Sequence, residues 1–340
     1  MADVPVTHVV VNPASGGGRA ALLLDRVTDR LASTGHGDVR VHRTQHWSDA
    51  VVGTRAARGA DALVVIGGDG MAHLGVNACA GTDTTLAIVP GGTGNDIARG
   101  IGLDAKHPLQ AVDALLAGHT RRIDALDLGE PGSDAPTEGN ESSGLQAGRG
   151  APASSSEAGF PPAAQRQRYV GSVLCTGFDA IVNQRANQMT RAQGSLRYLL
   201  AVIAELPSFA PLPYTLTIDG KARELEAMLV AVGNTACYGG GVRICPAADP
   251  GDGLADVTII HAASRTLLLR LLPQLYTGRF ARHRVVEQVR CTSITVAGQR
   301  ITAQGTDLGP LAAMGDGEPA GSAPVTATVT PSAVTVAVPT

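Results

Sequence analysis

An unbroken apolar run that ends directly on a glycine–aspartate turn is the feature that most constrains this chain. Residues 63–70 are Leu-Val-Val-Ile-Gly-Gly-Asp-Gly, and residues 86–96 repeat the arrangement as Leu-Ala-Ile-Val-Pro-Gly-Gly-Thr-Gly-Asn-Asp. A short continuous apolar run bounded by turn residues is typical of a parallel strand buried on both faces. Because the carboxyl ends of such strands meet at one edge of an open sheet, we expect the two loops to form one ligand site.

Phosphate is the ligand that these loops suit best. Their small side chains let backbone N–H groups approach phosphate oxygens, and Asp69 and Asp96 add carboxylates of the kind that hold Mg²⁺. The glycine-rich loop at 12–18 precedes a helical pattern, so its amides could bind an anion as well. That loop has neither the Walker lysine spacing nor the G-x-G-x-x-G pattern. Together the loops predict a site for a nucleoside triphosphate.

Strand-like and helix-like segments alternate through the first part of the chain. The strand patterns lie at 6–11, 39–44, 62–66, 86–89 and 122–128, and helical patterns lie between them at 19–31, 48–58, 71–80 and 108–117. This alternation predicts a doubly wound α/β domain over residues 1–128.

The composition changes after this domain. Residues 129–168 are mostly Gly, Pro, Ser and Ala, and their only large apolar side chains are Leu145 and Phe160. Such a segment buries too little surface to offset its ordering entropy, so we expect a disordered, low-complexity insertion.

The remainder of the chain is rich in short β-branched runs. These lie at 169–175, 214–218, 225–233, 255–260, 293–296 and 301–303, with helical patterns at about 179–191, 195–206 and 264–278. The spacing predicts a β-sandwich domain over residues 169–324. Residues 325–340 alternate again and are expected to return to the first domain.

The bulk properties exclude several classes of protein. The chain has 27 Lys+Arg against 30 Asp+Glu and only 3% aromatic residues, which argues against nucleic acid as a partner. Its five cysteines are scattered without a C-x-x-C pair, so we expect buried free thiols rather than disulfides or zinc ligands. There is no leader-like start and no apolar run of about 20 residues, which predicts a cytoplasmic protein with transient peripheral membrane contact.

Two acidic turns lie toward the C-terminus. In residues 315–318, Gly-Asp-Gly-Glu, one carboxylate could accept a proton while the other orients water or a metal ion. Residues 249–256, Asp-Pro-Gly-Asp-Gly-Leu-Ala-Asp, concentrate acids at a density that suits Mg²⁺. Either segment could instead be a solvated turn. We expect Trp47, placed in a loop, and His73, on the helix behind the glycine loop, to be packing residues.

The order of these motifs resembles the diacylglycerol kinase catalytic-domain family. The likeness is carried by Asn-Pro-x-Ser-Gly-Gly at 12–17, Gly-Gly-Asp-Gly at 67–70, Pro-Gly-Gly-Thr-Gly-Asn-Asp at 90–96 and Asp-Gly-Glu at 316–318. It is strongest to soluble bacterial lipid kinases related to sphingosine and ceramide kinases, and it covers the chain except for about 130–168. The resemblance implies a nucleotide domain like those of NAD kinases and phosphofructokinases, joined to a C-terminal β-sandwich. Met71 departs from the family's usual threonine.

The resemblance also implies roles for individual residues. Glu318, with Asp316 beside it, matches the proton acceptor, and Asp69 and Asp96 match carboxylates around the phosphates. Mg²⁺ is implied at Asp249, Asp252 and the carbonyl of Leu254, with Asp124 supporting the ion and water network near the phosphates. The residues implied to line the ATP site are Asn12, Pro13, Ala14, Ser15, Gly16, Thr44, Gly67, Gly68, Asp69, Gly70, Met71, Ala72, His73, Gly92, Thr93, Gly94 and Asn95.

These features together predict an ATP- and Mg²⁺-dependent lipid kinase whose foremost reaction converts diacylglycerol to phosphatidic acid. The sequence leaves open another lipid acceptor, such as a sphingoid base, ceramide or phosphatidylglycerol. It also leaves open a soluble acceptor such as NAD, and a regulator that binds nucleotide or lipid without catalysis. A membrane surface would present the lipid, and a homodimer is compatible with the sequence.

Overall fold

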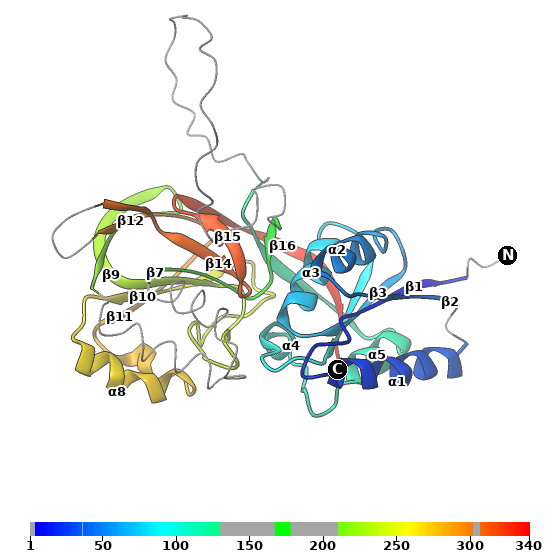
Figure 1. Cartoon of the computed structure of the whole chain (residues 1–340). Coiled ribbons are helices and arrows are strands. Elements are labelled where there is room, and N and C mark those ends of the chain that lie inside the picture. The colour runs from blue at the N-terminus through cyan, green and yellow to red at the C-terminus, as the bar shows by residue number, and fades with distance from the viewer. Residues whose placement is uncertain (1–3, 36, 130–166, 178–209, 302–306) are drawn as a thin grey trace, which may run out of the picture.

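The computed structural model describes residues 4–35, 37–129, 167–177, 210–301 and 307–340 (Figure 1). Within these residues the strands join into one 16-stranded sheet, which is parallel among the first four strands and antiparallel in the C-terminal part. The predicted combination of an α/β domain and a β-rich domain is therefore confirmed. Most of the predicted insertion, residues 130–166, and the predicted helices at 179–191 and 195–206 lie outside the described residues.

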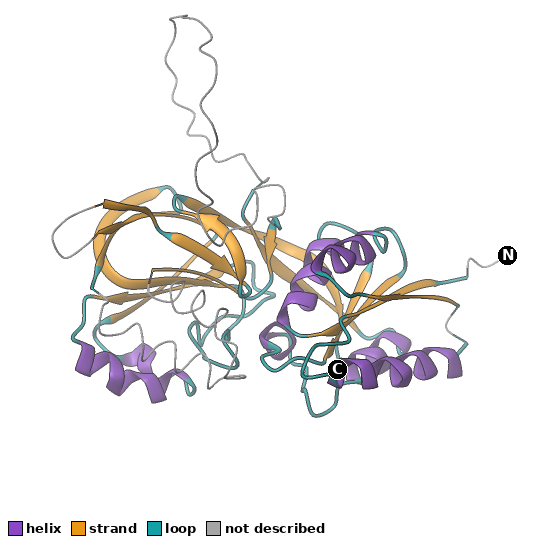
Figure 2. Ribbon diagram, viewed as in Figure 1, coloured by secondary structure: helices purple, strands orange, loops and turns teal. Residues whose placement is uncertain are grey.

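The N-terminal part is a doubly wound α/β domain. Four parallel strands run in the order β2 (Asp38–Arg43), β1 (Val6–Val11), β3 (Ala62–Gly67) and β4 (Thr85–Pro90). Helices cover both faces of this sheet, α2 and α3 on one side and α1 and α5 on the other (Figure 2). The helices are α1 (Arg19–Ser33), α2 (Trp47–Arg55), α3 (Asp69–Cys79), α4 (Asp96–Gly100) and α5 (Gln110–Leu116).

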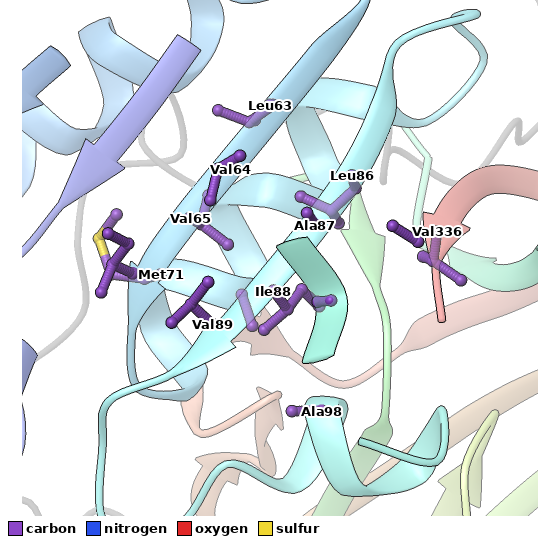
Figure 3. Packing of buried hydrophobic residues seen from close by; sticks show 14 of the residues in the cluster. Leu63, Val64, Val65, Met71, Leu86, Ala87, Ile88, Val89, Ala98 and Val336 are labelled. Carbon is purple, nitrogen blue, oxygen red and sulfur yellow. The ribbon is translucent and has the colours of Figure 1, made fainter. Parts of the chain in front are cut away.

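Burial explains why these segments adopt the predicted elements. Every residue of β3 is buried, as expected for a strand covered by helices on both faces. Helix α1 buries one face at helical spacing through Ala20, Leu23, Leu24, Val27 and Leu31. The apolar side chains of β3 and β4 pack together in the core, next to Val336 from the C-terminal end of the chain (Figure 3).

The C-terminal part has its own hydrophobic core and an antiparallel sheet. Its main path is β15 (Glu318–Ser322), β14 (Ala312–Gly315), β7 (Val173–Gly177), β9 (Lys221–Gly233), β8 (Leu212–Ile218) and β12 (Ser293–Ile301). Strand β9 also pairs with β10 (Ala255–His261), which pairs with β11 (Val286–Cys291). The remaining elements are β6 (Tyr169–Val170), β13 (Asp307–Pro310), α8 (Arg265–Leu275) and the short helix η3 (Arg279–Arg282).

One long strand runs through both parts. The first half of β16 (Val325–Ala337) pairs with β12, and Val336 near its end pairs in parallel with Leu86 of β4. Along its length β16 also pairs with β5 (Thr120–Asp127), with a register shift between Thr330 and Val334. The second half of the last described strand therefore lies inside the N-terminal sheet.

Three details differ from the sequence-based expectations or complete them. The placement of Trp47 in a loop was wrong, because Asp49 accepts hydrogen bonds from the backbone N–H groups of Gln45 and His46 and so starts α2 at Trp47. The strand predicted at 169–175 is interrupted between β6 and β7. The cysteines are free and buried, as expected.

We expect Leu86→Ala to destabilise the N-terminal part by about 3 kcal/mol, because Leu86 is fully buried between β3, α3 and β16 and its loss leaves a cavity. Leu22→Ala is the matched control, since Leu22 lies on α1 and is 74% exposed. Urea unfolding followed by far-UV circular dichroism measures both free energies. Equal stability of the two variants would contradict the assignment of Leu86 to the core.

Candidate active site

Three glycine loops meet at the carboxyl ends of β1, β3 and β4. The N–H of Gly91 donates to the carbonyl of Gly67 at 2.7 Å, and the N–H of Asn12 donates to that of Ile66 at 3.2 Å. A Cβ atom on Gly16 would lie 2.1 Å from the carbonyl oxygen of Gly91, in backbone that already has φ of 63°. Glycine is therefore required where the loops touch. Because the loops pack so closely, their backbone groups lie together at the edge of the sheet.

Asp69 and Asp96 form the carboxylate pair between these loops. Asp69 Oδ1 accepts hydrogen bonds from the N–H groups of Asp96 at 2.5 Å and Ile97 at 3.2 Å, so it caps α4. Asp96 accepts from Arg99 Nη1 at 2.6 Å and, through its other oxygen, from the N–H of Gly240 at 2.6 Å. The pair thus links two loops of the α/β part to a loop of the β-rich part.

The electrostatics of this pair favour a cation. Burial raises the pKa of Asp69 to about 7, with a further rise from Asp96 that the N–H groups of Ile97 and Asp96 oppose. Burial also raises the pKa of Asp96, although the N–H of Gly240 and the Arg99 guanidinium pull it down. Asp96 is buried, Asp69 is partly buried, and the Arg99 guanidinium that pairs with Asp96 is itself partly exposed, so added positive charge would stabilise the ionised forms of both carboxylates.

Asp316 is the most fully bonded carboxylate of the site. It occupies the turn between β14 and β15 with φ of 55°, and its side chain is completely buried. Oδ2 contacts His73 Nδ1 and accepts from the N–H of Gly171, both at 2.8 Å. Oδ1 accepts from the N–H of Ser172 at 2.7 Å and from its hydroxyl at 2.6 Å. Burial would raise the pKa of Asp316, but the contacts with His73, Ser172 and Gly171 outweigh it and hold the pKa below its usual range.

Glu318 reaches the glycine loop of β3 from the same turn. Its Oε1 lies 3.2 Å from the position that a Cβ atom of Gly70 would occupy, and the Trp47 ring lies 3.1 Å from that position. Burial raises the pKa of Glu318; His73 opposes the rise and Asp316 adds to it. The acidic turn of the β-rich part therefore lies beside the loop that carries Asp69.

The residues expected to line a nucleotide site divide into two groups. Met71, Ala72 and His73 are buried on α3, the last against Asp316, so they face the protein interior. The Thr44 hydroxyl donates to the carbonyl of Val11 at 3.1 Å. By contrast, Thr93 is exposed at the loop tip. Asn12, Pro13, Ala14, Ser15, Gly16, Gly67, Gly68, Gly70, Gly92, Gly94 and Asn95 belong to the loops that meet at the sheet edge.

The residues implied for Mg²⁺ lie around β5. The N–H of Gly253 donates to Asp124 Oδ2 at 2.7 Å, and Asp124 Oδ1 accepts from the N–H of Ser332 at 2.7 Å. Asp252 accepts from the N–H of Leu254 at 3.0 Å and also pairs with Arg290, while Asp249 accepts from the N–H of Gly251. In the described part of the chain, no group of three or more potential metal-binding side chains comes together. Through these hydrogen bonds Asp124 connects the 249–254 loop to β16. The binding of Mg²⁺ at these residues stays a prediction.

Sequence reasoning missed several groups that build the site. Arg99 holds Asp96 and donates to the carbonyl of Gly94 at 3.1 Å, and the Asp-x-x-Arg spacing on α4 was the available signal. Arg19 of α1 donates to the carbonyl of Gly92. The N–H groups of Gly240 and Ser172 have no side-chain signature, because any residue can supply them.

Glycine loops at the ends of parallel strands, with buried carboxylates and an acidic turn from a second domain, define a two-domain phosphotransferase. The family model of the diacylglycerol kinase catalytic domain matches residues 6–128, and that of the YegS C-terminal NAD kinase beta sandwich-like domain matches residues 172–338. The chain is 35% identical over 319 residues to a diacylglycerol kinase of Mycobacterium tuberculosis, covering 92% of each. It belongs to the diacylglycerol kinase family and is a lipid kinase.

Two more distant relatives are also diacylglycerol kinases. A diacylglycerol kinase of Bacillus subtilis is 24% identical over 275 residues, covering 80% of this chain and 78% of its own. The crystal structure of a diacylglycerol kinase from Bacillus anthracis has a TM-score of 0.66 at 19% identity, covering 100% of this chain and 98% of the other. That structure supports the fold across both parts.

We expect Asp316→Asn to lower the free energy of unfolding at pH 7 by about 2 kcal/mol, because the amide cannot accept all the hydrogen bonds that the carboxylate accepts. The folded protein holds the pKa of Asp316 below the ordinary 3.8, so its ionised form stabilises the fold above that pH. This contribution is lost as the pH falls through the lower pKa of the folded protein, and the difference from the variant should shrink there.

Urea unfolding at pH 7 and at several values below 5 tests this, with the exposed Asp83→Asn as the control. A difference that stays constant with pH would show that Asp316 does not contribute through its charge.

Proposed function

We propose that this lipid kinase transfers the γ-phosphoryl group of ATP to the free hydroxyl of diacylglycerol and forms phosphatidic acid. The observation that carries the proposal is the position of Glu318 beside Gly70, which follows Asp69 at the start of α3. A proton acceptor next to a phosphate-binding loop is the arrangement that phosphoryl transfer to an alcohol requires. The names of the relatives support the choice of acceptor.

Backbone groups would hold the triphosphate. Helix α3 begins at Asp69 and runs for 11 residues, so its N-terminal amides and macrodipole point at the junction of the glycine loops. The lack of side chains at Gly67, Gly68 and Gly92 lets the loops pack against each other beside those amides, so that backbone groups would meet the phosphate oxygens. Positioning of this kind supplies most of what an enzyme contributes to phosphoryl transfer.

The carboxylate pair fits a divalent cation. The ionised forms of Asp69 and Asp96 would both gain from added positive charge, because burial raises both pKa values. When bound there, Mg²⁺ would neutralise charge on the phosphate oxygens. Asp69 would hold the ion, and the Arg99 guanidinium would keep Asp96 oriented toward it.

Glu318 is the proton acceptor in this proposal and Asp316 is a positioning residue. The O–H bond of the lipid hydroxyl breaks as its oxygen bonds to the γ-phosphorus; the proton passes to Glu318, and ADP leaves. Burial raises the pKa of Glu318, which makes its carboxylate a better base. Asp316 already uses both oxygens in hydrogen bonds and keeps a low pKa, so it orients the turn and does not take the proton.

We expect Glu318→Gln and Asp69→Asn each to lower kcat by at least about 100-fold. The first variant removes the base, and the second removes a negative charge beside the phosphates. Steady-state transfer from ATP to diacylglycerol in detergent micelles measures the effect. The exposed Glu224→Gln is the control, and far-UV circular dichroism checks the fold. Turnover within a few-fold of the wild type in both variants would remove Glu318 and Asp69 from the mechanism.

A screen of acceptors tests the substrate. We expect kcat/KM for diacylglycerol to exceed that for sphingosine, ceramide and phosphatidylglycerol by at least about tenfold, since hydroxyl acceptors are told apart by the polar groups around them. Labelled ATP and mass measurement of the product identify what is phosphorylated. Transfer to NAD in place of any lipid, or nucleotide binding without transfer, would overturn the proposal.

A further inference from the structure

The segment between β10 and β11, residues 262–285, forms a strongly basic surface that we call the α8–η3 surface. It contains no Asp or Glu, and its arginines all have exposed side chains: Arg265, Arg270, Arg279, Arg282 and Arg284. In Figure 1 the helix α8 lies along the outside of the β-rich part, below β10 and β11. The surface thus projects positive charge from a chain whose net charge is −3.

This surface also exposes large apolar side chains. Helix α8 buries Leu271, while Leu267, Leu268, Leu272 and Leu275 are partly buried against the domain core. Leu269, next to Arg270, is 47% exposed, and Tyr276, at the end of α8, is 44% exposed. Apolar side chains set among arginines on one helix are typical of a segment that lies in a membrane interface.

The acids of the described residues do not pair with the positive charge of this surface. None of its five arginines forms an ion pair with a carboxylate of the described residues. The nearest acid along the chain, Glu287, pairs with Arg223 at 2.7 Å and with His261 at 2.9 Å. A partner for this surface must therefore bring negative charge together with an apolar layer.

A loop connects the α8–η3 surface to the candidate active site. The N–H of Arg243 donates to the carbonyl of Leu275 at the end of α8, at 3.0 Å. In the same loop, the N–H of Gly240 donates to Asp96, and Gly241 lies against the Arg99 guanidinium. A partner that held α8 in place would therefore also hold in place the loop that contacts Asp96.

We propose that the α8–η3 surface docks this protein on a bilayer that contains anionic phospholipids. The arginines face the headgroup phosphates, and Leu269 and Tyr276 enter the boundary with the acyl chains. None of the helices in the described residues has the length and apolar character to cross a bilayer. The inference rests on the proposed function, because docking serves an enzyme whose acceptor lies in the membrane.

The test is co-sedimentation of the full chain with vesicles. One set contains phosphatidylcholine alone and the other equal parts of phosphatidylcholine and phosphatidylglycerol. We expect the double variant Arg270→Gln/Arg282→Gln to bind the anionic vesicles about 25-fold more weakly, since each arginine near an anionic surface contributes about fivefold. The matched control Arg55→Gln/Arg58→Gln removes the same charge from exposed positions at and just beyond the end of α2.

A second variant separates apolar insertion from charge. We expect Leu269→Gln to weaken binding to the anionic vesicles by about tenfold even at high salt, where the difference made by the arginines is screened. Equal binding by the arginine variant and its control would overturn the proposal, as would equal binding of the wild type to both vesicle sets.

Turnover of short-chain diacylglycerol in solution distinguishes this inference from the proposed function. The arginine variant should keep wild-type turnover there and lose it only on vesicles. If the wild type phosphorylates diacylglycerol neither in solution nor on vesicles, the proposed function fails, whatever the vesicle-binding results are. If the arginine variant loses turnover in solution as well as on vesicles, the α8–η3 surface acts through the site and the docking proposal is wrong.

Discussion

The buried carboxylate of Asp316 is the interaction on which the rest of the site depends. It joins three segments that are far apart in the sequence: α3 through His73, the connection between β6 and β7 through Gly171 and Ser172, and its own β-hairpin turn. A buried charge is tolerated only when its oxygens are bonded, and here both are. Because this bonding fixes the hairpin against α3, Glu318 is held beside the glycine loop of β3.

The carboxylates of the site differ because their surroundings differ. Asp316 receives enough hydrogen bonds to keep a low pKa, whereas burial raises the pKa of Asp69, Asp96 and Glu318. One acid is thus a fixed structural charge, while the others gain from a cation or a proton. Carboxylates with such different pKa values suit a reaction that brings negative groups together, neutralises their charge and transfers a proton within one site.

Local signals predicted the fold of the α/β part well. The apolar runs of β3 and β4 and the glycines after them report burial and close backbone approach, which depend on neighbouring residues in the sequence. The hairpin of β14 and β15 and the edge strand β11 were missed, because their pairing partners lie far along the chain. The residues implied for Mg²⁺ illustrate the same limit: sequence shows that acids are dense at 249–256, but not that Asp252 pairs with Arg290 and Asp124 with backbone N–H groups.

The path of β16 has a consequence for how the protein is made. Among the described strands, the one that pairs with β4 at the edge of the parallel sheet comes last in the sequence and is synthesised last. While the ribosome is still working, β4 has an open, apolar edge that β16 has yet to cover, and such edges recruit other chains. The amino-terminal domain therefore completes its sheet only once β16 is available, and alterations to this strand should disturb the assembly of both domains.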